Sequence, residues 1–142
     1  MRKRFVLVLT LVLILSGSSN IYAQQSSDIN RQESIISPFF TYISQHYVYI
    51  SKSEGKIKCE SILSFTRYKA RVTNTLQKQE GNQWTDVSSK STTYSSPSAK
   101  SFVSTFSGTT GTKYRFKSLV EIIDASGKVL ESASEYSNDM TY

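Results

Sequence analysis

The chain has 142 residues, a formal net charge of +6, 38% hydrophobic residues and a single cysteine. This length fits one domain with a hydrophobic core, and a single cysteine excludes an internal disulfide. Three basic residues and no acidic residue fall within residues 1–23, so the 119 residues that follow carry 14 basic and 11 acidic side chains, a net charge of +3. An excess of this size is too small to indicate nucleic acid or an anionic membrane as a partner.

The first 23 residues have the organisation of a secretory signal peptide. Arg2, Lys3 and Arg4 form a basic start, an apolar run follows at residues 5–15, and small residues lead to Ala23. A membrane-spanning helix needs about 20 apolar residues, more than this run provides. We therefore predict cleavage after Ala23 and a secreted, extracellular protein without a stable membrane anchor. An uncleaved N-terminal anchor is the alternative.

The segment at residues 24–34 is polar, and we expect a disordered leader there. One folded domain is expected over residues 35–142, with at most a helical turn near Ile35. Polar and apolar residues alternate almost throughout this domain, which is typical of half-buried β-strands. In the clearest stretches the alternation places one row of side chains on the inner face of a sheet: Ile57, Cys59, Ser61, Leu63, Phe65, Tyr68, Ala70, Val72, Asn74 and Leu76.

Glycine-containing turns separate the expected strands, for example at residues 53–55, 80–82 and 124–127. About seven strands follow from these breaks, a number and spacing that predict an all-β fold, a single antiparallel β-sandwich. The basic row Arg67, Lys69 and Arg71 is interpreted as the solvated outer face of one strand. The expected strands are residues 47–52, 56–65, 67–78, a strand starting near residue 84, 100–106, 113–122 and 128–136.

The segment at residues 111–120 carries a resemblance to a known fold. A glycine turn precedes Tyr114, and Phe116 and Val120 lie on the same face of the strand as this tyrosine. The segment resembles the penultimate-strand region of fibronectin type III and immunoglobulin-like domains, in which a tyrosine caps the corner between the sheets. The resemblance implies an immunoglobulin/fibronectin III-like sandwich. The chain departs from the fibronectin pattern because Trp84 lies mid-chain rather than in an early core strand.

Three motifs carry a second resemblance, which covers the whole of the chain after residue 23. They are Ser37-Pro38-Phe39-Phe40, the strand at residues 76–78 leading to Gly81-Asn82-Gln83-Trp84, and residues 111–116. The chain is similar in these motifs to a group of small uncharacterised secreted β-rich proteins of Gram-positive bacteria. This resemblance implies a shared fold and supplies no activity and no site residue.

Few residues offer catalytic or metal-binding chemistry. His46 is the single histidine, and Cys59 is expected on an inner face, so a catalytic Cys–His pair and a zinc site are both poorly supported. Glu131 and Glu135 share one strand face with Glu121 on the neighbouring strand, and we interpret all three as solvated rather than as a glycosidase pair. We therefore expect no enzyme, no catalytic or metal-binding residue and no cofactor.

The chain is rich in aromatic residues, and they admit two interpretations. Exposed aromatic side chains can stack on sugars or anchor a protein partner. Buried ones would fill a core that has no disulfide, and we favour this second interpretation. The residues concerned are Tyr42, Tyr47, Tyr49, Trp84 and Tyr94.

The expected function is that of a secreted, non-enzymatic binding module for an extracellular protein or glycan, with no ligand-binding residue assigned. The expectation depends on the lack of catalytic motifs and on a fold that commonly presents binding surfaces. The alternative is a secreted antagonist, either an antibacterial polypeptide or an inhibitor of a secreted enzyme. An inhibitor would present a rigid protruding loop, for which residues 85–98 are the candidate.

Overall fold

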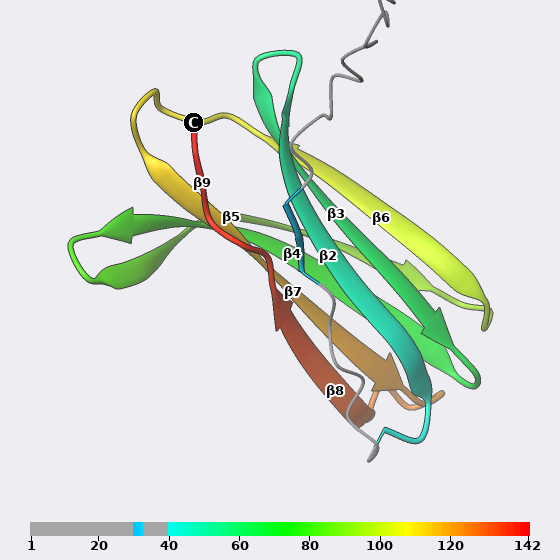
Figure 1. Ribbon diagram of the computed structural model, residues 1–142. Helices are drawn as coiled ribbons and strands as arrows, with labels where there is room; N and C mark the ends of the chain where they lie inside the picture. The colour runs from blue at the N-terminus through cyan, green and yellow to red at the C-terminus, as the bar shows by residue number, and fades with distance from the viewer. Residues whose placement is uncertain (1–29, 33–39) are drawn as a thin grey trace, which may run out of the picture.

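The computed structural model describes residues 30–32 and 40–142 (Figure 1). The expected signal peptide, most of the expected leader and the helical turn near Ile35 lie outside the described residues. The described residues form strands, turns and loops, with no helix among them. Three residues of the expected leader form the short strand β1 (Asn30–Gln32), which pairs with residues 48–50 of the next strand.

Two antiparallel sheets pack face to face, which confirms the predicted antiparallel β-sandwich (Figure 1). One sheet has the order β1-β2-β3-β6, with β2 (Ile43–Ser53), β3 (Lys56–Phe65) and β6 (Ala99–Phe106). The other has the order β5-β4-β7-β8, with β9 (Met140–Thr141) also paired to β7. Its main strands are β4 (Lys69–Glu80), β5 (Gln83–Tyr94), β7 (Lys113–Ile123) and β8 (Val129–Tyr136). The seven predicted strands correspond to β2–β8.

The predicted inner faces are confirmed in β3 and β4, except at Tyr68, which is 39% exposed in the turn before β4 because the strand begins only at Lys69. Every second residue of β3 from Ile57 to Phe65 is buried, and in β4 Ala70, Val72, Asn74 and Leu76 are buried. Side chains of successive strand residues point to opposite faces of a sheet, so the alternation of the sequence becomes an interior and an exterior. The side chains on the outer faces therefore do not belong to the core and can contact solvent or a ligand.

The connection from β6 to β7 crosses from one sheet to the other, and Tyr114 closes that corner. The Tyr114 ring is buried, and its hydroxyl accepts a hydrogen bond from the backbone N–H of Thr109 at 3.0 Å. Phe116 and Val120 are fully buried on the same face of β7, as predicted. The tyrosine thus holds the loop before β7 against the end of the sandwich.

Candidate functional site

Cys59 is a core residue, as its inner-face position predicted. Its side chain has no exposed surface and lies in an apolar cluster with Ile50, Ile57 and Phe116. Burial raises the pKa of the thiol to about 12, because the apolar surroundings disfavour the thiolate. The reactive form of a cysteine is the thiolate. Cys59 therefore has neither the charge state nor the access of a nucleophile.

His46 is also buried, and the structure does not bring it to Cys59. In the pairing of β2 with β3, His46 lies opposite Leu63 and Cys59 lies opposite Ile50. Four residues of β2 separate the two positions, about 13 Å along the strand. The His46 Nε2 atom instead lies 2.9 Å from the Ser118 hydroxyl of the opposite sheet. Burial lowers the pKa of the imidazole to about 4, so His46 is neutral at neutral pH.

His46 belongs to a buried layer of polar side chains across the middle of the sandwich. Ser61 donates to Asn74 Oδ1 at 2.6 Å and lies 2.8 Å from the Ser118 hydroxyl. The Asn74 amide donates to the Phe102 carbonyl at 3.1 Å and to Ser104 at 3.2 Å. Apolar residues fill the interior on either side of these groups. We call the following set the polar layer: His46, Ser61, Asn74, Ser104 and Ser118.

The prediction of a shared solvated face for the three glutamates is wrong. Glu121 lies on the outer face of its sheet, where its carboxylate pairs with Arg71 at 2.8 Å. Glu131 lies on the inner side of β8 and accepts the backbone N–H groups of residues 41, 42 and 43 at 2.7 to 3.1 Å. Glu135 lies on the same side, and burial raises the pKa of its carboxyl group. Glu131 therefore fixes the start of β2 to β8 rather than taking part in an acid pair.

The interpretation of the aromatic residues as core is correct for some and wrong for others. Tyr42 and Tyr94 pack at the rim of the core. Tyr47 and Tyr49 are half-buried on the outer face of the four-stranded sheet, because the buried positions of β2 are Val48 and Ile50. Trp84 is half-buried on the outer face of the five-stranded sheet, where its ring lies against Arg115.

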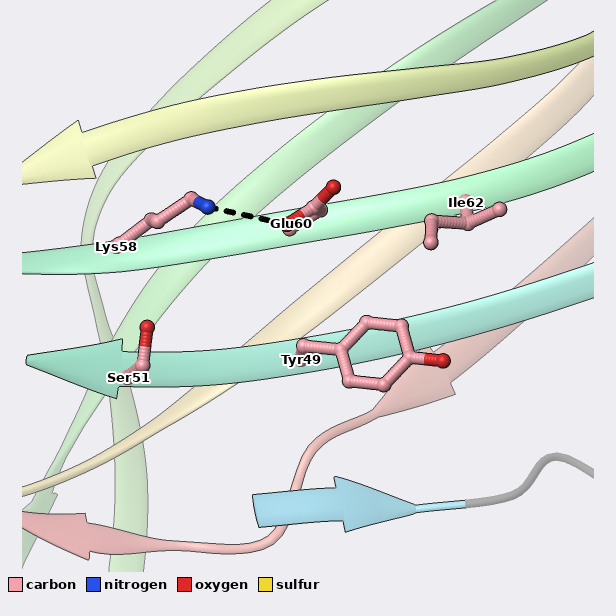
Figure 2. A pocket seen from close by; sticks show the side chains of 5 residues that line it. All are labelled: Tyr49, Ser51, Lys58, Glu60 and Ile62. Atoms are coloured by element: carbon pink, nitrogen blue, oxygen red, sulfur yellow. Dashed lines mark ion pairs between the residues drawn. The ribbon is translucent and has the colours of Figure 1, made fainter. Parts of the chain in front are cut away.

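A hollow of about 250 Å³ lies on the outer face of the four-stranded sheet. Tyr49 and Ser51 of β2 and Lys58, Glu60 and Ile62 of β3 line it (Figure 2). Lys58 and Glu60 form an ion pair at 3.2 Å, and the Ser101 hydroxyl of β6 donates to Glu60 at 2.8 Å. The hollow thus combines an aromatic ring, an aliphatic side chain and a fixed pair of charges.

The structure contradicts one other sequence-based candidate and agrees with most of a second. Residues 85–98 are not a protruding loop, because residues 85–94 belong to β5 and pair with β4. In the basic row, Lys69 and Arg71 belong to β4, and Arg67 lies in the preceding turn with its guanidinium 5.5 Å from the Tyr68 ring. Lys69 and Arg71 thus lie on the outer face of β4, as interpreted, whereas Arg67 does not belong to the strand.

The described part of the chain contains no group of three His, Cys, Asp or Glu side chains placed to hold a metal ion. Within residues 30–32 and 40–142, no helix has the length and apolar character needed to cross a membrane. The chain matches no protein-family model, no curated protein and no solved structure. The outer faces of the two sheets are thus the features from which a function can be argued.

Proposed function

We propose that the protein is a secreted, non-enzymatic binding module that recognises an extracellular protein or glycan. The observation that carries the proposal is the hollow on the outer face of the four-stranded sheet, lined by Tyr49, Ser51, Lys58, Glu60 and Ile62. Secretion is supported by the basic and apolar organisation of residues 1–23.

The composition of the hollow suits recognition rather than catalysis. Tyr49 and Ile62 offer apolar surface, and Ser51, Lys58 and Glu60 offer hydrogen-bond donors and acceptors. The ion pair of Lys58 with Glu60, together with the bond from Ser101, restricts the rotation of the polar side chains before a partner arrives. Pockets that enclose a whole small molecule usually measure roughly 300–1,000 Å³. The smaller hollow fits one protruding group of a larger partner.

We also propose that the sandwich is immunoglobulin/fibronectin III-like. The strand order β2-β3-β6 facing β5-β4-β7-β8 supports this assignment, because the chain changes sheet between β3 and β4, between β5 and β6 and between β6 and β7, which gives the Greek-key connections of that architecture. The hydrogen bond from Thr109 to the Tyr114 hydroxyl at the start of the penultimate long strand supports it further. The similarity in motifs to small secreted β-rich proteins of Gram-positive bacteria is consistent with the same proposal.

The proposal is tested by saturable binding to a glycan array and to purified extracellular proteins and cell-wall fractions. The substitution Tyr49→Ala removes the aromatic wall of the hollow and is expected to weaken a genuine interaction about tenfold or more. Tyr68→Ala is the matched control, because Tyr68 is 39% exposed and lies in the turn before β4, away from the hollow. No saturable binding, or equal losses in the two variants with folding intact, would contradict the proposal.

A secreted antagonist is the second candidate function, and one observation favours it. The hairpin of β4 and β5 extends beyond β7, since the pairing of β4 with β7 ends at Lys78 whereas its pairing with β5 continues to Glu80 (Figure 1). A projecting hairpin is a shape that can enter the cleft of an enzyme. Inhibition of bacterial growth or of a secreted enzyme, lost when Gly81 and Asn82 are replaced by a longer polar turn, would favour this candidate over the first.

A further inference from the structure

The outer face of the five-stranded sheet holds an arginine in a fixed position. The Arg115 guanidinium carbon lies 4.5 Å from the centroid of the Trp84 ring and 4.6 Å from that of Tyr136, within the range of cation–π attraction. Its Nε atom donates to Gln77 Oε1 at 2.7 Å. We call this set the arginine cluster: Gln77, Trp84, Asp86, Arg115 and Tyr136.

The base of the cluster is oriented before any ligand binds. Gln77 is only 8% exposed although it faces outward, and its amide nitrogen donates to Asp86 at 2.6 Å. This bond turns the amide oxygen toward Arg115. Residues of four strands, β4, β5, β7 and β8, therefore hold the Arg115 guanidinium in one position. Less side-chain entropy is then lost when the guanidinium binds a ligand.

Arg115 retains hydrogen-bond donors that no acceptor in the described part of the chain uses. A guanidinium has five N–H donors, and among the described residues only the Nε donor of Arg115 has an acceptor. No carboxylate of residues 30–32 or 40–142 forms an ion pair with Arg115 or with Lys117, the next outward residue of β7. Arg71 on the same sheet face differs, because its Nε atom pairs with Glu121 at 2.8 Å.

The free part of the guanidinium defines the chemistry of the ligand. Its planar fork of N–H groups matches two oxygens of a carboxylate or a sulfate, and Lys117 adds a second positive charge beside it. The aromatic side chains offer apolar edges around the anion, since Tyr136 is 36% exposed and Trp84 is half-buried. The exposed parts of these rings can pack against the C–H surface of a sugar ring, which a flexible acidic peptide lacks.

We propose that the arginine cluster binds an oxyanion, a carboxylate or a sulfate, carried on a glycan. The inference goes beyond the proposed recognition at the hollow, because the two places lie on opposite outer faces of the sandwich. It adds a second contact surface with its own ligand class.

Titration calorimetry with two defined glycans tests the proposal and separates the two sources of the anion. Hyaluronan oligosaccharides carry carboxylates alone, and a sulfated neutral galactan carries sulfates alone. We expect the protein to bind at least one of them, and Arg115→Ala to weaken that binding about tenfold or more. Arg115→Lys should also weaken it, because lysine lacks the planar fork. Arg71→Ala, the control on the same face, should change it by less than about twofold.

Three results would overturn the proposal. They are no binding of either glycan, an equal loss in Arg71→Ala and Arg115→Ala, and equally tight, Arg115-dependent binding of polyglutamate, which would identify an acidic peptide as the ligand. Denaturation curves of each variant establish folding, and Arg115→Lys decides if Arg115→Ala does not fold. The Tyr49→Ala variant should bind the anionic glycan normally, so failure of the hollow and failure of the arginine cluster are distinguished.

Discussion

Two polar groupings lie on opposite faces of the same strands, β4 and β7. The polar layer uses Asn74 and Ser118 on the inner face, and the arginine cluster uses Gln77 and Arg115 on the outer face. Inside, Asn74 makes three hydrogen bonds to protein groups. On the outer face, Arg115 makes one hydrogen bond, and its remaining donors have no acceptor among the described residues.

The difference follows from access to water. A buried polar group that lacks a partner costs free energy on folding, so the interior requires partners within the protein. An exposed donor forms its hydrogen bond with water, and a ligand can displace this water without such a cost. The inner grouping should therefore control the free energy of unfolding, and the outer grouping should control binding. Four substitutions or conditions test this division.

Asn74→Ala should have the largest effect, a loss of about 3 kcal/mol in the free energy of unfolding, because it leaves Ser61, Ser104 and the Phe102 carbonyl with fewer partners and opens a cavity. Urea denaturation followed by circular dichroism measures it. Thr73→Ala is the matched control on the outer face of the same strand and should cost less than about 1 kcal/mol. Similar losses in the two variants would remove the energetic distinction between the faces.

Acidification should destabilise the protein through His46. The unfolded chain binds a proton at this residue below pH 6.5, whereas the folded protein binds it only near pH 4, so protons favour the unfolded state between these values. Stability is thus full above pH 6.5 and falls by about 3 kcal/mol by pH 4. Glu135 acts in the opposite sense, because its folded-state pKa is raised and its ionisation as the pH rises opposes folding.

Denaturation midpoints measured from about pH 7 to 5 check the role of His46. The His46→Gln variant should be less stable at pH 7 but should no longer lose stability on acidification in this range, since the chain has a single histidine. An unchanged slope in the variant would assign the acid sensitivity to other groups.

Glu131→Gln tests a polar contact of intermediate burial. The carboxylate accepts three backbone N–H groups at the start of β2, and loss of its charge should cost about 1–2 kcal/mol in the free energy of unfolding. Glu135→Gln is the control, because burial disfavours the charge of Glu135 and its removal should be neutral or stabilising. Hydrogen exchange at residues 41–43 should increase in Glu131→Gln alone.

Arg115→Ala should have the smallest effect on stability, about 1 kcal/mol, because two partly exposed cation–π contacts and one hydrogen bond are lost, and removal of the side chain opens its partners to water. The same denaturation series measures it. A loss as large as that of Asn74→Ala would show that the arginine cluster is a structural element rather than a binding surface.

The sequence predicted the sandwich and most inner faces because polar and apolar residues alternate over most of β3, β4 and β7. The strands β1 and β9 were missed, since three and two residues are too few to show a period. In β5 the outward position of Trp84 was not predictable, because the strand is mostly Ser and Thr and a bulge lies opposite Leu76 and Gln77. In β2, Tyr47 and Tyr49 alternate with Val48 and Ile50, so both faces look apolar.

The site residues were less predictable than the fold because their contacts are distant in the chain. Glu131 accepts hydrogen bonds from backbone groups that are 88 to 90 residues away in the sequence, and no local sequence pattern indicates that contact. Arg115 contacts Gln77 because β4 pairs with β7, and this pairing can be predicted only when the strand order is known. The polar layer did leave a signal, since Ser61 and Asn74 interrupt otherwise apolar inner rows at the same level of the sandwich.

The polar layer also has a consequence for how the chain folds. Its members come from five strands of both sheets, and the pair His46 and Ser118 is separated by 72 residues. In either sheet alone these groups would face water, and they lose that water when the sheets pack, so packing is favourable only where the partners from the other sheet replace it. Contacts between residues so far apart in the chain form slowly, and here they join one sheet to the other. The domain should therefore unfold in a single cooperative transition rather than sheet by sheet.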